Sequence, residues 1–331
     1  MFRNTFAKLI VGAVIAFMTI FNAPLSLAQS GQAFPARPIK IIVAFAAGGS
    51  SDILARLLAQ QFTLRTGATV VVENRPGASG AIAMEVVAKA APDGYTLLWG
   101  SDSTVVQPLL HKDFPVDPLK DLTPLAKLGT APIVISVNKN VPANSIKELV
   151  DLAKAKPGAL HYGSGGSGST QNLAGEEFKH RANINMVHIP YKGTAPALID
   201  TLGGSIEVVF TGVVEVSKYM APGSGIRVLA VMGKDRVAML PGVPTMIESG
   251  YPDFISGSWF GVLAPVGLPP QVASYLTENI IAASQTAEFR QRTNALALDN
   301  ITANGPDTAA FMKSFAARTK ETITRAGIKV D

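Results

Sequence analysis

The stretch Ile39–Phe45 (IKIIVAF), which runs into the turn Ala46–Asp52 (AAGGSSD), decides the fold. Three isoleucines and one valine give it the β-branched composition that is typical of a buried strand. After the turn, apolar residues recur at the spacing of one helix face: Leu54, Leu57, Leu58 and Phe62. A strand that enters a helix through a Gly/Ser-rich turn is typical of a β-α-β unit, in which the strands are parallel.

The same alternation continues toward the C-terminus. Thr69–Val72 and Tyr95–Trp99 have strand character, and Ala81–Ala90 between them has helix character. This order of elements predicts a parallel sheet with right-handed crossovers. From Leu119 to Asn138, prolines and short β-like runs replace the pattern, so we expect the chain to cross there into a second lobe.

A second α/β unit follows this crossing. Its expected elements are helices at Ser145–Ala155, Gln171–His180 and Thr194–Leu202, and strands at His161–Tyr162, Met186–Ile189, Ile206–Phe210 and Ile226–Met232. We expect Trp259–Ala264 to cross back as a strand, followed by helices at Pro269–Thr286 and Asp307–Ala326, the second with Asp307 as its N-cap. We therefore predict an α/β fold of two lobes with a ligand cleft and two hinge crossings. Residues 34–134 plus 255–331 form lobe 1, and residues 135–254 form lobe 2.

Residues 1–28 have the pattern of a cleavable signal peptide. Arg3 and Lys8 precede the apolar run Leu9–Phe21, which is too short for a comfortable membrane span. Ser26 and Ala28 then place small residues before the expected cleavage site, and the alternative is an uncleaved anchor. We expect export to the periplasm with cleavage after Ala28 and, because the chain has no cysteine, no lipid anchor.

The composition of the 331 residues excludes several kinds of site. Without cysteine there is no disulfide, no thiolate metal site and no cysteine nucleophile. The formal net charge of +5 falls to +3 once Arg3 and Lys8 leave with the signal peptide, and no basic run is interleaved with aromatic residues, so we expect no nucleic-acid partner. The four histidines have no metal-like spacing: His111, His161, His180 and His188. We expect neither a metal nor a cofactor.

Two loops share one design, in which a strand ends, a Gly/Ser-rich turn follows and a helix begins. They are residues 48–52 and 164–169, and Pro190–Thr194 is a third candidate of this kind. Glycine allows the backbone close to a ligand, and the unpaired amides and dipole of a helix N-terminus favour a carboxylate or another anion. The alternative is that the serines are plain N-caps and that Asp52 only complements a helix dipole.

Two enzymatic interpretations of these loops are weaker. Gly163, Gly165 and Gly168 match the spacing of a dinucleotide-binding fingerprint, but no acidic residue lies between Asn183 and Ile199 to bind a ribose. Export also removes the chain from the NAD pool. The chain has no G-x-S-x-G elbow and no phosphate-binding P-loop, although an exported Ser/His hydrolase stays open because a triad needs no local signature.

Several longer motifs make the chain recognisable. They are RPIKIIVAFAAGGSSDILAR, VVVENRPGASG, AAPDGYTLLWGS, YGSGGSGSTQNLAGE, HIPYKGTAPALIDTLGG, LPGVPTMIESGYP and SWFGVLAP. Their order and spacing from Phe34 to about Arg325 resemble the Bug-type extracytoplasmic receptors of tripartite tricarboxylate transporters. This resemblance implies a type II periplasmic-binding-protein fold that closes over a small solute, usually an organic carboxylate, and presents it to the membrane permease subunits.

The resemblance also implies the ligand site. The family's pocket lies between the first strand-helix loop, here residues 45–52, and the serine-rich loop, here residues 164–169. By position, the implied ligand-binding residues are Phe45, Gly48, Gly49, Ser50, Asp52, Ser101, Ser103, Ser164, Ser167, Ser169, Asn172, Tyr191, Gly193, Thr194 and Thr211. We expect the hydroxyls of Ser167 and Ser169 to bond the carboxylate.

The chain departs from the family pattern at three positions. Ala47 stands where proline is common, Asn172 where histidine is common, and Thr211 where aspartate is common. The missing acid at Thr211 weakens the case for a ligand with an amine, so we expect a carboxylate without a compulsory ammonium group. We expect a monomer. A receptor that passes its closed form to a sensor protein, and an exported hydrolase, are the alternatives.

Overall fold

The computed structural model describes residues 34–45, 47, 50–191, 193–220 and 224–328. The chain divides into a unit Met1–Ala36 and a unit Arg37–Asp331, and the fold below is that of the second. The expected signal peptide lies outside the described residues, and so do Gly48 and Gly49 of the first loop. Among the described helices, none has the length and apolar character that a membrane span requires.

The first half of the sheet has the expected parallel β-α-β order. β1 (Ile39–Val43) lies between β2 (Val70–Asn74) and β3 (Thr96–Ser101), and both neighbours pair with it in parallel. Helices α2 (Ser50–Thr66) and α3 (Ala81–Ala88) make the two connections. The β-branched run that begins at Ile39 is therefore a buried central strand, as its composition predicts.

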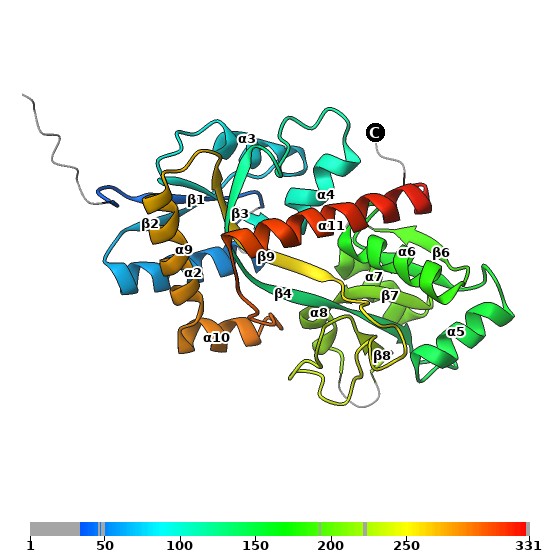
Figure 1. Cartoon of the computed structure of the whole chain (residues 1–331). Helices are drawn as coiled ribbons and strands as arrows, with labels where there is room; N and C mark the ends of the chain where they lie inside the picture. Colours follow the sequence, from blue (N-terminus) through cyan, green and yellow to red (C-terminus); the bar gives the residue numbers. More distant parts are fainter. Residues whose placement is uncertain (1–33, 46, 48–49, 192, 221–223, 329–331) are drawn as a thin grey trace, which may run out of the picture. The chain divides into compact units, whose positions relative to one another are not determined.

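Two long antiparallel strands, β4 and β9, form the middle of the ten-stranded sheet (Figure 1). β4 (Leu122–Asn138) pairs with β9 (Gly257–Pro265) along its first part, and its residues from Ile133 onward pair with the second half of the sheet. The sequence pattern predicts short β-like runs here, whereas β4 is one continuous strand. Its ladder shifts register between Pro124 and Ala126, because proline has no amide hydrogen for a regular ladder.

The second half of the sheet confirms a second α/β unit. Its elements are α5 (Ile146–Ala155), β5 (His161–Ser164), α6 (Thr170–Ala182), β6 (Val187–Pro190), α7 (Thr194–Gly203), β7 (Val208–Gly212), α8 (Val213–Ser217) and β8 (Ile226–Val231). β5 pairs in parallel with β6 and β7, while β7 and β8 pair antiparallel with β4. Ser145 caps α5 by accepting the Glu148 amide hydrogen at 3.1 Å.

The C-terminal segment returns to the first half of the sheet and then spans both halves. It contains α9 (Pro270–Ser284), α10 (Ala287–Asn294), β10 (Ala303–Asn304) and α11 (Gly305–Ala326). α11, red in Figure 1, packs on β4 and reaches both α4 (Asp102–Leu110) and α6. The prediction of Asp307 as its N-cap is wrong: Asn304 is the cap and accepts the Asp307 amide hydrogen at 3.0 Å. Pro306 fits the first helical turn, which moves the cap toward the N-terminus.

Each half of the sheet has its own apolar core. Ile42, Leu98 and Trp259 belong to one cluster, and Tyr162 and Phe210 to another. A smaller cluster contains Val106 and Leu110 of α4 and Leu173 of α6, with Phe315 of α11 against it. Two cores bridged by β4, β9 and α11 are the arrangement that a two-lobed receptor needs, and the exact lobe boundaries stay a prediction.

Candidate functional site

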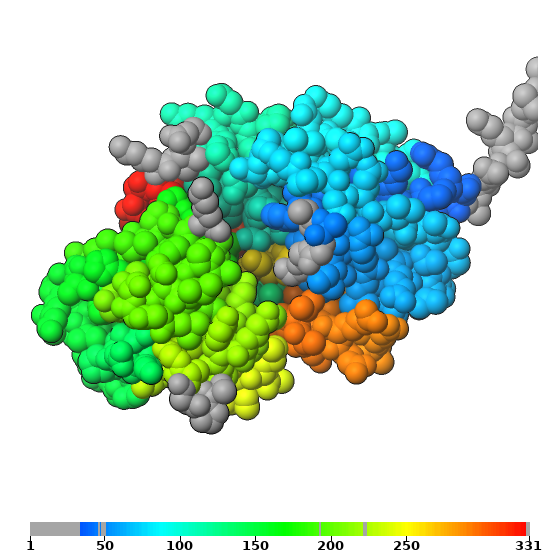
Figure 2. All heavy atoms as spheres, turned by 180° about the vertical axis from the view of Figure 1, so that it is seen from behind, coloured from blue at the N-terminus to red at the C-terminus, as the bar shows by residue number. Residues whose placement is uncertain are grey.

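A pocket of about 340 Å³ lies between the two halves of the sheet. In Figure 2 it is the hollow between the blue and cyan residues of the first half and the green residues of the second, with yellow β9 residues at its floor. The residues that line it are Phe45, Ser51, Ser101, Asp102, Ser103, Val106, Gln107, Gly168, Ser169, Thr170, Gln171, Ser258 and Phe260. Most are small and polar, so the pocket offers hydrogen bonds from many directions.

Residues from the first turns of three helices line this pocket. Ser51 lies in the first turn of α2, Asp102 begins α4, and Thr170 begins α6. The first amides of a helix have no partner within the helix, and the aligned peptide dipoles add partial positive charge there. An anion in the pocket therefore meets a favourable potential from the starts of α2 and α6, whereas the Asp102 and Ser103 amides at the start of α4 donate to the Asp102 carboxyl group.

The N-terminus of α4 is placed by close packing of β3 on β9. A Cβ atom on Gly100 would lie 2.1 Å from Leu263 Cδ1, so glycine at this position leaves room for the Leu263 side chain over β3. The Ser101 amide donates to Thr104 Oγ1 at 3.0 Å, and α4 starts directly after the strand. The sequence pattern does not predict α4, because Thr104, two valines and Pro108 have low helix propensity.

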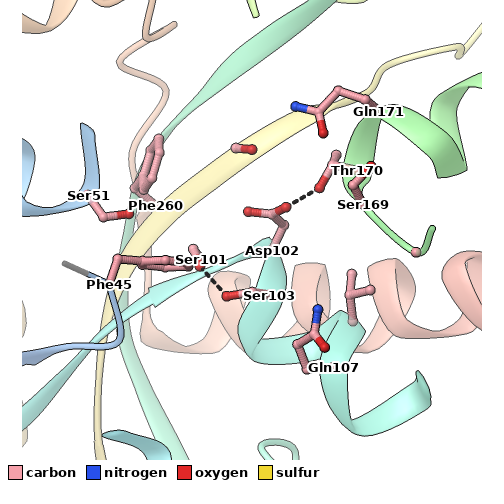
Figure 3. A pocket seen from close by; sticks show the side chains of 13 residues that line it. Phe45, Ser51, Ser101, Asp102, Ser103, Gln107, Ser169, Thr170, Gln171 and Phe260 are labelled. Atoms are coloured by element: carbon pink, nitrogen blue, oxygen red, sulfur yellow. Dashed lines mark hydrogen bonds between the residues drawn. The ribbon is translucent and has the colours of Figure 1, made fainter. Parts of the chain in front are cut away.

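Two serine hydroxyls of this turn form a pair at the pocket wall. Ser101 Oγ and Ser103 Oγ lie 2.9 Å apart (Figure 3). Each hydroxyl has one donor and two acceptor positions, so the pair can still bond a third group. The Phe45 and Phe260 side chains line the pocket beside them (Figure 3). This wall combines hydroxyl donors with apolar surface, as small-molecule sites commonly do.

Asp102 is the one ionisable residue among the described residues that line the pocket. The Thr170 hydroxyl donates to Asp102 Oδ2, which links the start of α4 to the start of α6 (Figure 3). Burial raises the pKa of Asp102, although hydrogen bonds from Thr170 and Ser258 act in the opposite direction. The sequence pattern does not single out Asp102, since an acid in a first helical turn usually needs no explanation beyond the helix dipole.

The serine-rich loop contributes only its end to the pocket. Gly168 and Ser169 line it, and Ser169 Oγ accepts the Asn172 amide hydrogen at 3.2 Å as the N-cap of α6. Ser164 is buried and lies outside the lining; its hydroxyl bonds His188 Nε2 at 2.7 Å and the backbone of Gly166. Ser167 is exposed and lies outside the lining as well.

Asn172 holds the serine-rich loop from behind. It is buried, its amide donates to Tyr162 Oη at 2.9 Å, and its carbonyl accepts the Gly168 amide hydrogen at 3.0 Å. Tyr162 in turn donates to Glu176 Oε1 at 2.6 Å. Burial and the Glu176 carboxylate raise the pKa of Tyr162, so the phenol stays a donor at every physiological pH.

Asp52 and Ser50 of the first loop differ in their relation to the pocket. Asp52 is buried and accepts from Arg56 Nε at 2.9 Å and from Asn74 Nδ2 at 3.0 Å, which ties α2 to the end of β2. It lies outside the residues that line the pocket. Ser50 is the first residue of α2, next to Ser51, which does line the pocket.

Residues of the third loop, Pro190–Thr194, donate hydrogen bonds to two acids outside the pocket lining, Asp200 and Glu215. Tyr191 Oη donates to Asp200 Oδ2 at 2.7 Å, and burial together with this bond raises the pKa of Tyr191 to about 12. The hydroxyls of Thr194 and Thr211 donate to Glu215 at 3.3 and 3.4 Å. Gly193, the N-cap of α7, donates its amide hydrogen to the Gly165 carbonyl at 3.3 Å. Of the implied third-loop residues and Thr211, none belongs to the described pocket lining.

The described part of the chain contains no group of three or more histidine or acidic side chains that could hold a metal ion. The site chemistry is therefore that of hydroxyls, amides and one carboxyl group.

Comparisons with known proteins identify the family and the fold. The family described as "Tripartite tricarboxylate transporter family receptor" matches residues 54–328. Protein BugT of Bordetella pertussis is 35% identical over 321 residues, which cover 96% of this chain and 98% of that protein. A TctC solute-binding protein from Polaromonas has a TM-score of 0.79 at 30% identity, covering 88% of this chain and 99% of that one. The R. palustris protein Rpa4515, solved with adipate, has a TM-score of 0.75 at 31% identity, covering 90% and 100%.

Proposed function

We infer the function from one premise: this chain belongs to the tripartite tricarboxylate transporter receptor family. It has the α/β fold of periplasmic binding proteins and is a solute-binding receptor of this family. We propose that the pocket between the two halves of its sheet captures a small organic carboxylate, and that the loaded receptor delivers it to the membrane permease of its transporter.

The observation that carries the proposal is the convergence of the N-termini of α2, α4 and α6 on one pocket. A carboxylate there would accept from helix amides and from the hydroxyls of Ser101, Ser103 and Ser169, all within the positive ends of the helix dipoles. The adipate in the R. palustris relative supports a carboxylate as the ligand class.

The remaining implied residues fit supporting roles. We propose that Asn172 and Ser164 hold the serine-rich loop in shape, and that Asp52 fixes the start of α2 through Arg56 and Asn74. Thr194 and Thr211 would act in the same way on the second half through Glu215. Ligand contact then falls to the hydroxyls and amides at the helix ends.

Closure of the two halves over the solute would make the loaded state distinct for the permease. A ligand drives closure only by binding the closed state more tightly than the open one. Groups from both halves line the pocket, namely Ser101 and Ser103 from the first and Ser169 from the second, so a carboxylate that bridges them meets this condition.

We further propose that the chain acts as a freely diffusing periplasmic monomer without catalysis, after cleavage of residues 1–28. The buried position of Ser164 supports the absence of a Ser/His hydrolase, since a nucleophile must reach its substrate and Ser164 lies outside the pocket lining. His188, its partner, packs on the Tyr162 ring.

The full chain, produced with its own N-terminus and purified from the periplasm, tests the proposal. Thermal unfolding is measured with panels of mono-, di- and tricarboxylates and with the corresponding uncharged amides. A ligand at a hundred times its Kd stabilises the folded state by about 2.7 kcal/mol, which is a clear rise in Tm. We expect at least one carboxylate, and none of the amides, to give this rise. Stabilisation by amides alone would contradict the proposal.

A further inference from the structure

Asp102 lines the pocket and, unlike the ion-paired acidic residues of the described chain, has only neutral hydrogen-bond donors as its described partners. Asp52 forms an ion pair with Arg56, and Glu177 forms ion pairs with Arg181 and Arg325. Asp102 faces the pocket and accepts hydrogen bonds from neutral groups, the Thr170 and Ser258 hydroxyls and nearby backbone amides. Among the described residues, no lysine, arginine or histidine forms an ion pair with it.

This arrangement has an electrostatic cost. Taking a carboxylate out of water disfavours its charged form, and burial accordingly raises the pKa of Asp102. Hydroxyl donors and the N-terminus of α4 offset part of that cost, but a nearby positive charge would offset more. A ligand whose charges are all negative would instead repel the ionised form of Asp102 and raise its pKa further.

The rest of the pocket suits a negative group. The N-termini of α2 and α6 and the paired hydroxyls of Ser101 and Ser103 supply donors, and among the described lining residues only Asp102 is ionisable. The pocket thus has donors on several sides and one acid at the junction of α4 and α6. This polarity fits a molecule that carries both charges.

From this juxtaposition we propose that the ligand is a carboxylate that also carries a protonated nitrogen, and that Asp102 is the residue that selects the nitrogen. The inference rests on the proposed function and narrows it to one class of carboxylates. Thr211 stands where an acid is common in the family, and its lack of a carboxylate predicts a ligand without an ammonium group. Asp102 places a carboxyl group on the opposite, first half of the pocket, where it can take over that role. Helix N-termini hold the carboxylate, and Asp102 accepts from the nitrogen.

Calorimetry with matched pairs of ligands tests this selectivity. The pairs differ only in the amino group: L-aspartate and succinate, L-glutamate and glutarate, 4-aminobutyrate and butyrate. For wild-type protein we expect at least one amino member to bind about tenfold or more tightly than its partner, since a hydrogen bond between charged groups contributes on that scale. Asp102→Asn should weaken that member about tenfold to a hundredfold and leave the partner equal or tighter.

Glu278→Gln is the matched control, because Glu278 also accepts from a hydroxyl, that of Ser274 at 2.7 Å, yet lies outside the described pocket lining. It should leave the preference unchanged. Asp102→Ser is measured beside Asp102→Asn, and thermal unfolding of both variants checks that the fold is kept.

The two ideas fail in different ways. If carboxylates bind but the members without nitrogen bind as well as or better than their amino partners, or if Asp102→Asn leaves a preference intact, the role of Asp102 is overturned. If no carboxylate of either kind binds, the proposed function itself falls.

Discussion

The serine-rich loop and the N-terminus of α4 differ in how many polar groups they present to the pocket. Residues 164–169 hold three serines and three glycines and look in sequence like the principal ligand loop. In the structure only the end of this loop lines the pocket, whereas Ser101, Asp102 and Ser103 at the start of α4 all line it. The shorter and less conspicuous turn therefore presents more polar groups to the site.

The difference comes from where the hydrogen bonds go. Ser164 uses its hydroxyl on His188 and on the loop backbone, and Asn172 uses its side chain on Gly168 and Tyr162. These groups are satisfied inside the protein and keep the loop in one shape. A polar residue near a pocket is thus a ligand group only if the fold leaves it with free hydrogen-bonding capacity.

The largest expected effect comes from breaking the support behind the serine-rich loop. Gly175 of α6 packs on the buried Tyr162 ring, and an added Cβ would lie 2.4 Å from Tyr162 Cε2. Gly175→Ala should force the ring away and lower the free energy of unfolding by about 2–3 kcal/mol, the upper part of the range for overpacked cores. Urea denaturation measures this change.

Gly203→Ala is the matched control for that substitution. Gly203 is the last residue of α7 and is exposed, and an added Cβ would meet nothing within 4 Å. Its replacement should be neutral or should stabilise the fold by about 0.4–1 kcal/mol, because alanine restricts the unfolded chain more than glycine does. Equal losses in the two variants would show that contact with Tyr162 is not the cause.

The second prediction compares the serine-rich loop and the start of α4 by their effect on ligand affinity. Ser103→Ala removes one hydroxyl of the pair at the pocket wall and should weaken binding of the best carboxylate by about 1.5 kcal/mol, roughly tenfold. Ser167→Ala should leave the affinity unchanged, because Ser167 is exposed and outside the lining. Calorimetry on both variants decides: a loss at Ser167 with none at Ser103 would return the principal role to the serine-rich loop.

Much of the fold could be predicted because it follows from local patterns. The β-branched run at Ile39–Phe45 and the helical spacing after it predict a parallel β-α-β unit, and the structure confirms it. β4 could not be predicted as one strand, because Pro124 and Pro132 interrupt the local pattern while pairing with β9 stabilises the strand across both. That pairing joins residues more than a hundred positions apart in the chain.

The site could be predicted in part for a similar reason. The resemblance to a receptor family points to Phe45, Ser101, Ser103 and Ser169, which line the described pocket. The role of Asp102 in the site could not be predicted from the sequence, because it depends on burial of the carboxyl group and on the absence of a described cationic partner. Both are properties of the packed halves, since Thr170 and Ser258 reach Asp102 only in the folded chain.

The smallest expected change in stability concerns Glu177 in the middle of α6, away from the N-terminus of this helix that lines the pocket. Glu177 accepts from Arg181 and Arg325, so although burial raises the pKa of Glu177, these bonds hold it below its usual value. A lowered pKa means that the stabilisation is present above the pKa of the unfolded chain, about 4.3, and is lost as pH falls through the lower folded value. Glu177→Gln should therefore cost about 1 kcal/mol at pH 7, since the pair is partly exposed, and nothing at low pH. Urea denaturation across this range checks it against Glu321→Gln, an exposed partner of Arg325 that should change little. A cost for Glu177→Gln that persisted at low pH would mean that packing, not charge, joins α6 to α11.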